Sequence, residues 1–478
     1  MPQIDPVTNK PQTMQGMDSN SFNRLKDAFQ AQVYGKRKKK GASVNIGGKT
    51  INSDQIWDAL LQYGSLRVLA MNKHAALSNV TFGSFMNAIE GFANEHYSLK
   101  NYTKAKSLYT AGMIGMTQDL LARAPESKIG LLNEYFDVLQ EFDEYGNPMG
   151  NRQMALRGNT GALYFLMSSG EHMIQTQMGL ALMLNTKFQT SKGEVNLYDA
   201  YTVVNGRLEL DPEVEAQFDQ VQRAEFTEKM HAVYQRIHGI YNEKDKSALQ
   251  QYTAGRWAMQ FRKWARPGYL RRFQGIEKLF YDKESDLKKL DFNERLQTEV
   301  EGNYITTIRF FERVRQDLFK LQFLTSPARY KELSSHQQAN LRRSLGESIG
   351  LVVLFVLGGL FEGDDDEPRN AFQNQMLYNV KRVQSEFLFY NPLGSSFYEI
   401  LRTPAANLTS IEAYGKLGAQ LVSDMTSILT GGDFERYKRK SGKFEKGDAK
   451  LGKYWRNVLI GKEFFSDPKD KLKFFDLQ

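Results

Sequence analysis

The chain has 478 residues, of which 41% are hydrophobic and 25% charged, and its mean hydropathy is −0.52. This composition is typical of soluble globular proteins and argues against a membrane protein or a disordered chain. Because the chain is too long to form a single ordinary hydrophobic core, we expect two or three helical subdomains. The absence of cysteine excludes disulfides, thiolate catalysis and cysteine-based zinc or iron–sulfur sites.

The net charge of +8 is concentrated at the two ends of the chain. Residues 1–50 contain nine Lys or Arg against three Asp or Glu, and residues 431–478 contain thirteen against eight. The part between them is therefore net negative. This distribution argues against a broad nucleic-acid groove across the body, and it permits contacts of the two ends with DNA, RNA or anionic lipid.

Residues 1–52 read as a basic N-terminal arm, which we expect to be disordered over about its first 18 residues. This polar opening lacks the apolar core of a signal peptide, so we expect no export signal. A run of five cations follows a first short helix. Such a run binds polyanions through counterion release, but it more often forms a solvated loop, so both interpretations stay open. The cations are Lys36, Arg37, Lys38, Lys39 and Lys40.

A small hairpin is expected next, because β-prone residues flank Gly47-Gly48. The same stretch nearly matches a phosphate-binding loop that ends in Gly-Lys-Thr. Ser43 stands where that loop requires its first glycine, and a lysine run precedes it instead of a buried strand. We therefore reject nucleotide binding here.

Residues 53–184 have helical periodicity and read as an N-terminal helical domain, with a break expected near Ser78 and Asn79. Its last segment, residues 163–184, is strongly apolar and rich in methionine. Methionine fills irregular packing gaps, so we interpret this segment as a core or inter-subunit helix and not as a ligand site. The methionines are Met167, Met173, Met178 and Met183.

Residues 185–266 read as a β-hairpin region followed by a pair of helices. Asn205-Gly206 separates two β-prone runs and suits the two positive-φ positions of a type I′ turn. Asp211 then stands as an N-cap before Pro212, so a helix should begin there. With β-structure expected mainly at 187–210, the fold class is mainly α, built from many helices.

Three aromatic residues near position 260 recur at helical spacing beside arginines and lysines. They are Trp257, Phe261 and Trp264. Interleaved aromatic and cationic side chains can stack bases and hold phosphates. An amphipathic helix that buries its aromatic stripe explains the same pattern, so we interpret these residues as a structural seam.

Residues 267–430 read as a C-terminal helical domain, and residues 431–478 as a basic, aromatic tail. The domain contains the uncharged run 349–361, which is too short for a bilayer span of about 20 residues. A core helix is the favoured interpretation, and insertion into a membrane is the alternative. The residues that would serve either role are Leu351, Val352, Leu354, Phe355 and Leu357.

No catalytic constellation is visible in the sequence. His231 and His238 share a helical face, but no HExxH motif accompanies them and cysteine ligands are absent. We therefore predict no catalytic residue, no cofactor and no metal, although a carboxylate pair formed only in space would escape a search of the sequence.

An ordered set of motifs resembles the large internal virion proteins of crAss-like tailed phages. The set comprises LYDAY, NGRLEL, HGIYNEKDK and QFRKW between 197 and 264, and then QANLRR at 338–343. Residues 1–190 carry no such motif. The family also includes chains with a virion RNA polymerase, whose aspartate cluster alternates with other residues. The consecutive Asp364, Asp365 and Asp366 do not match that cluster, so no catalytic residue is carried over.

The resemblance implies a non-enzymatic virion protein that is packaged inside the capsid or tail lumen and ejected into the host cell with the genome. Expected partners are other virion proteins, DNA or RNA through the basic ends, the host membrane during ejection, and further copies of the chain. The main alternative is a nucleic-acid-binding or virion RNA polymerase-associated subunit. A third hypothesis is a cell-wall-degrading enzyme.

Overall fold

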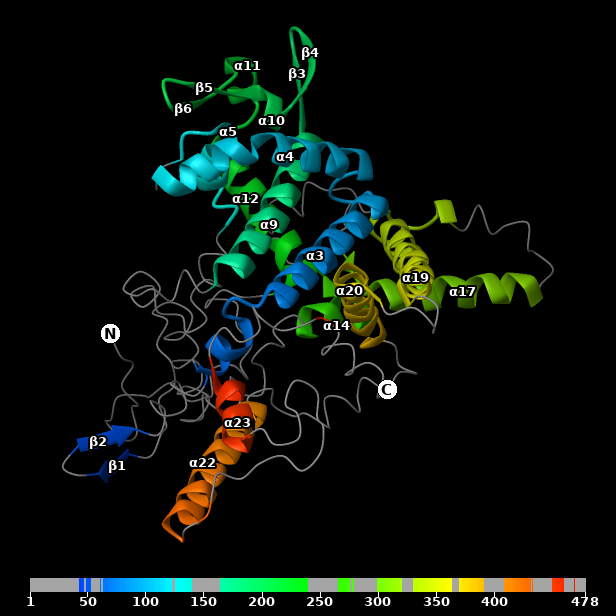
Figure 1. Cartoon of the computed structure of the whole chain (residues 1–478). Helices are drawn as coiled ribbons and strands as arrows, with labels where there is room; N and C mark the ends of the chain where they lie inside the picture. Colours follow the sequence, from blue (N-terminus) through cyan, green and yellow to red (C-terminus); the bar gives the residue numbers. More distant parts are fainter. Residues whose placement is uncertain are drawn as a thin grey trace, which may run out of the picture.

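The structure is a computed structural model, and within the residues it describes the protein is mainly α, as predicted (Figure 1). The described residues are 43–46, 49–52, 61, 63–122, 125–139, 164–239, 265–275, 277–278, 299–319, 330–362, 369–390, 408–430, 432, 449–459 and 468.

The strands in the described residues form four separate antiparallel pairs. These are β1 (Ser43–Ile46) with β2 (Lys49–Asn52), β3 (Lys187–Thr190) with β4 (Gly193–Asn196), β5 (Tyr201–Val204) with β6 (Arg207–Leu210), and β7 (Glu277–Lys278) with β8 (Glu299–Val300).

The hairpin predicted around Asn205-Gly206 is confirmed. Val204 pairs with Arg207, and the two turn residues have φ values of 50° and 74°. Both values are positive, as a type I′ turn requires. The predicted cap is also present, because the Asp211 side chain accepts a hydrogen bond from the backbone N–H of Glu213 at 2.9 Å. The short helix α11 (Pro212–Glu215) follows it.

The main core lies among five helices: α3 (Lys73–Ala93), α4 (Leu99–Ala122), α5 (Lys128–Tyr135), α9 (Phe165–Asn185) and α12 (Gln220–His238). Helix α9 packs against both α3 and α4. The methionines of this helix lie in the core as predicted, with Met167, Met178 and Met183 buried and Met173 partly buried. The hairpins join α9 to α12 through the four-residue helix α10 (Leu197–Ala200) and α11.

The break expected near Ser78 and Asn79 is wrong, because α3 continues unbroken through both residues. Their polar side chains serve tertiary contacts instead. The Ser78 hydroxyl donates to Asn379 Oδ1 at 3.0 Å, and the Asn79 amide donates to Glu171 Oε1 at 2.6 Å. Tertiary hydrogen bonding therefore outweighs their local preference for turns.

A second set of helices comprises α14 (Ala265–Phe273), α17 (Asn303–Phe319), α19 (Ser335–Glu362) and α20 (Ala371–Leu388) (Figure 1). Helices α19 and α20 pack on α3, and α14 packs on α12 and α17. Helix α19 contacts α3, α17 and α20. It has 28 residues, so the apolar segment predicted at 349–361 forms only its C-terminal half. One buried cluster contains Met86 of α3, Val233 of α12 and Leu354 of α19. Residues from three of the predicted regions, 53–184, 185–266 and 267–430, thus contribute to a common core.

Two further helices, α22 (Leu408–Leu429) and α23 (Lys450–Val458), pack against each other. Helix α23 lies within the predicted basic tail and is attached to the N-terminal part of the chain. The Tyr63 hydroxyl donates to the Val458 carbonyl at 2.5 Å, and Arg67 Nε donates to the Asn457 carbonyl at 2.9 Å. Helix α23 therefore contacts residues that lie almost 400 positions earlier in the chain.

Candidate functional site

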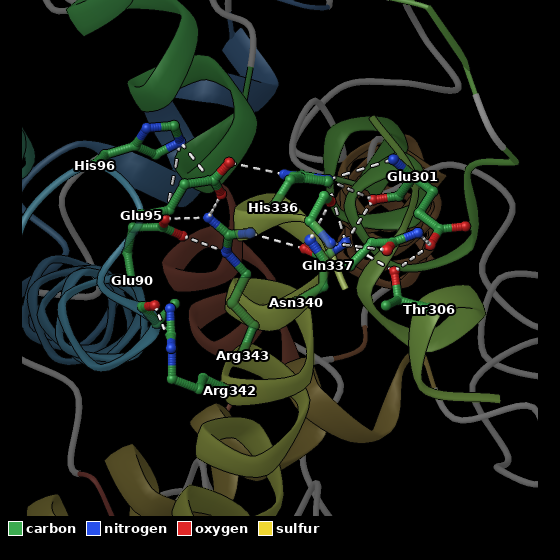
Figure 2. A network of polar contacts seen from close by, with 12 residues as sticks. Glu90, Glu95, His96, Glu301, Thr306, His336, Gln337, Asn340, Arg342 and Arg343 are labelled. Atoms are coloured by element: carbon green, nitrogen blue, oxygen red, sulfur yellow. Dashed lines mark hydrogen bonds and ion pairs between the residues drawn. The ribbon is translucent and has the colours of Figure 1, made fainter. Parts of the chain in front are cut away.

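A buried polar cluster forms where the turn between α3 and α4 meets α19 (Figure 2). Asn94 ends α3 with a left-handed backbone, at φ 54°, and its N–H donates to the Glu90 carbonyl. This type of helix end reverses the chain tightly. It therefore places Glu95 and His96 beside Glu90, on the side that faces α19.

Helix α19 supplies the opposite side of the cluster. His336, Asn340, Arg343 and Glu347 are spaced by four, three and four residues, so they project from one face of the helix. All four side chains are buried. The same face continues with Gly350, Leu354 and Gly358, which are buried too. One helical face is thus polar in its first half and apolar in its second.

Arg343 is the centre of the cluster, with its side chain only 1% exposed. Its Nε donates to Glu90 Oε2 at 2.9 Å, and its Nη2 contacts both Glu90 Oε1 and Glu95 Oε2. Its Nη1 donates to Asn340 Oδ1 at 2.7 Å. A planar guanidinium suits such a forked arrangement of acceptors, which a lysine cannot match.

His336 extends the network toward α17. Its Nδ1 lies 2.8 Å from Glu95 Oε1, and a carboxylate oxygen can only accept, so Nδ1 carries the hydrogen. The other ring nitrogen then accepts from the backbone N–H of Glu301 at 3.3 Å. The Glu301 carboxylate accepts from the Thr306 hydroxyl at 2.9 Å. Figure 2 shows this chain of contacts running from α3 through α19 to α17.

A second ionic centre lies four residues further along α19, at Glu347. Arg272 Nε donates to its Oε2 at 3.1 Å, and the Tyr304 hydroxyl donates to the same atom at 2.9 Å. Arg271 approaches the other carboxylate oxygen at 3.8 Å. Arg272 also lies over the ring of Tyr390, 4.2 Å from its centroid, which is a cation–π contact. Helices α14, α17 and α19 are joined by this centre.

The ionisation of the first centre is set by burial and by Arg343. Burial alone would raise the pKa of Glu90, but the Arg343 guanidinium outweighs it and lowers that pKa to about 2. Burial, supported by the positive charges of Arg343 and Arg236, lowers the pKa of His96 to about 4 against the opposing effect of its two carboxylate neighbours. Near neutral pH the cluster therefore holds ionised glutamate, neutral His96 and charged arginine.

Glu90, Glu95 and His96 have ligand atoms within 4.8 Å of one another, a spacing that a metal ion could bridge. However, the Arg343 guanidinium contacts both carboxylates directly. A metal ion would have to displace this cation and leave a buried arginine without its partners, which is costly. The arrangement therefore fits an ionic clamp between α3 and α19 better than a metal centre.

Several predicted site residues fall outside the described residues. These are the cations Lys36, Arg37, Lys38, Lys39 and Lys40 and the seam residues Trp257, Phe261 and Trp264. The two histidines of α12 are described and bond to separate partners. His231 Nε2 lies 2.8 Å from the Asp137 carbonyl, and His238 Nε2 lies 2.8 Å from Asn87 Oδ1.

The predicted apolar segment of α19 is divided between the core and the surface. Leu354 is buried, and Leu351 and Leu357 are partly buried against the core, whereas Val352 and Phe355 are 62% and 55% exposed. Within the described part of the chain, α19 alone is long and apolar enough to cross a membrane, and 28% of its most apolar window is buried. One face of the segment therefore lies against the core, and the other face is exposed.

The ionic clamp was not predicted from the sequence. A signal was available in the spacing of His336, Asn340, Arg343 and Glu347, which places polar residues on the face that becomes apolar after Gly350. Their partners on α3 lie about 250 positions away, and helical periodicity carries no information about such pairing. Comparison with protein-family models, with curated proteins and with solved structures gave no significant match to this chain.

Proposed function

We propose that this chain is a non-enzymatic bacteriophage virion protein, packaged inside the capsid or tail and ejected into the host with the genome. The structural observation that carries the proposal is the outer face of α19, which is apolar and exposed on a helix fixed to the core by two buried ionic centres. Exposed apolar surface on a rigid element is typical of an assembly surface. The resemblance of the motifs to internal virion proteins favours the phage particle as the assembly in question.

The chemistry of the clamp supports a structural role. A general acid or base works best with a pKa near the working pH. Glu90, with a pKa of about 2, and His96, with a pKa of about 4, lie well below neutrality. Both groups are directed at other protein side chains: Glu90 joins α3 to α19 through Arg343, and His96 lies within 3.9 Å of Glu90 and 3.8 Å of Glu95.

The basic ends support contact with the packaged genome as part of the same proposal. Residues 1–50 and 431–478 carry the positive charge, while the part between them is net negative. Counterion release would make such binding independent of base sequence and weaker at high salt. A polymerase-associated subunit would use the same basic ends to bind nucleic acid. A specific effect of the chain on transcription would favour that alternative.

Mass spectrometry on purified phage particles and on freshly infected cells tests the proposal. We expect the chain in purified particles. In cells infected while host and phage translation is blocked, we expect the chain inside the cells within minutes. A chain that is made late and is never found in purified particles would overturn the proposal.

A further inference from the structure

The outer face of α19 carries a continuous stripe of six apolar side chains. At about 100° per residue, they project within about 100° of one another around the helix. Each is between 45% and 70% exposed. The six residues are Leu345, Ile349, Val352, Val353, Val356 and Leu360.

The opposite face of α19 is already used within the chain. It carries Arg343 and Glu347 of the ionic centres, and Leu354 is buried below them. Gly350 lies so close to α3 that an added Cβ would stand 2.1 Å from Phe85 Cζ. Helix α19 is thus held on its inner side, and the stripe is the side directed away from these contacts.

The six residues of the stripe are symmetric about a point between Val352 and Val353, whereas Phe355, 55% exposed at the edge of the stripe, has no counterpart. Counted outward from that point, the two valines come first, then Ile349 and Val356, and then Leu345 and Leu360 at the ends. In an antiparallel pair of these helices, Leu345 would lie against Leu360 of the second copy, and Ile349 against Val356. The two central valines of one copy would lie against the two central valines of the other. A two-fold interface requires this self-complementarity.

From these observations we infer that two copies of the chain associate through the α19 stripe, with the two helices antiparallel about a two-fold axis at Val352 and Val353. The steps of four and three residues from Leu345 to Ile349 to Val352 match the spacing by which paired helices interlock their side chains. β-Branched residues occupy the centre of the stripe and leucines its ends.

A second copy fits the stripe better than a lipid bilayer. Helix α19 is long enough to cross a bilayer, but its uncharged run 348–361 extends only about 21 Å at 1.5 Å per residue. A span across the hydrocarbon core, which is about 30 Å thick, would therefore bury Glu347 or Glu362 in lipid. Lengthening the span would pull Glu347 away from Arg272, to which it is bonded at 3.1 Å. Arg342, at the N-terminal end of the stripe, donates to the Ala93 carbonyl at 2.7 Å, so it is engaged within the fold.

Sedimentation of the full-length chain tests the pairing. We expect a dimer for the wild type and at least about a 100-fold weaker association for Val356→Glu, because each dimer would bury two unpaired carboxylates. Ile114→Glu is the matched control, since Ile114 is 74% exposed on α4, away from the stripe. A wild-type chain that stays monomeric at about 50 µM, well above a dissociation constant of about 1 µM, would overturn the inference.

Cysteine cross-linking tests the antiparallel geometry, and the natural chain contains no cysteine to interfere. Val352→Cys should form a disulfide dimer with itself. Leu345→Cys and Leu360→Cys should each fail alone, because their copies would lie about 22 Å apart along the helix. Mixed together, these two variants should cross-link. Efficient self-cross-linking of Leu345→Cys would indicate a parallel pair and overturn the inference.

Vesicle flotation distinguishes the membrane outcome. Vesicles of phosphatidylethanolamine and phosphatidylglycerol should not capture the wild-type dimer. Flotation of a monomeric chain that is lost in Val356→Glu but kept in Ile114→Glu would assign the stripe to lipid and overturn the pairing. Both variants lie at exposed positions, so circular dichroism should show wild-type helix content for each.

Discussion

Arg343 of α19 donates to both carboxylate oxygens of Glu90 at the end of α3, although the two residues lie 253 positions apart in the chain. Both side chains are almost completely buried. This contact fixes the N-terminal half of α19, and the fixed half positions the apolar half that follows. The stability and the proposed assembly of the protein therefore depend on the same helix.

Replacement of Arg343 by alanine should lower the free energy of unfolding by at least about 3 kcal/mol, because it leaves the Glu90 carboxylate buried without its partner. Urea unfolding followed by circular dichroism measures the change. Lys104→Ala is the control, since Lys104 and Asp199 form an exposed ion pair and its loss should cost less than about 1 kcal/mol. Equal losses for the two variants would contradict the account of the clamp.

Acid should destabilise the protein between pH 6.5 and 4. Burial, helped by Arg271, lowers the pKa of His238 to about 3, and the pKa of His96 is lowered to about 4. In this window the unfolded chain binds protons that the folded protein does not, so stability falls as pH falls. Glu90 adds a further loss between pH 4.5 and 2, because its folded pKa lies below its unfolded one.

The free energy of unfolding should be measured in urea at about pH 7.0, 5.5 and 4.5, because these values cover the range in which histidines of the unfolded chain take up protons. His238→Asn should give a shallower decrease than the wild type. His231→Asn, at a half-buried position of the same helix, should decrease in parallel with the wild type. An unchanged slope in His238→Asn would show that this histidine does not remain neutral in the folded protein.

Zinc should not stabilise the wild-type chain, because Arg343 already occupies the side of Glu90 and Glu95 that a metal ion would need. Thermal unfolding with Zn²⁺ and with a chelator should give the same midpoint, and His96→Ala should respond identically. A rise in the midpoint with Zn²⁺ that disappears in His96→Ala would show that a metal displaces the guanidinium.

Two glycines of α19 should respond in opposite directions to alanine. A Cβ at Gly350 would stand 2.1 Å from Phe85 Cζ, and that ring is held against Phe387 at a centroid distance of 5.4 Å. Gly350→Ala should therefore lose about 1–3 kcal/mol of unfolding free energy. Gly359 has no atom within 4 Å of such a Cβ, so Gly359→Ala should gain about 0.5–1 kcal/mol. Urea unfolding of both variants checks the signs, and the same sign for both would contradict the packing of α19 on α3.

Local features were predictable from the sequence. The turn at Asn205-Gly206 and the cap at Asp211 depend on the conformational preferences of one or two residues, and both are present. Helix α9 carries many methionines and leucines, which favour burial, and its methionines lie in the core. The mainly α fold follows from the same short-range signals.

Features that depend on distant partners were not predictable. The start of α19 was missed because its first half is polar, and only contacts with Glu90, Glu95 and Glu301 make a buried helix of it. The break expected at Ser78 failed for the same reason, since Asn379 satisfies its hydroxyl. Periodicity identifies a buried face, but it does not identify what covers that face.

We propose that the chain travels inside the particle and leaves it with the genome. Quantitative mass spectrometry of intact particles and of particles emptied in vitro tests it most directly. We predict several copies of the chain per intact particle and a loss of most copies on emptying, in parallel with the DNA and unlike the capsid protein. Absence from intact particles, or full retention in emptied ones, would contradict the proposal.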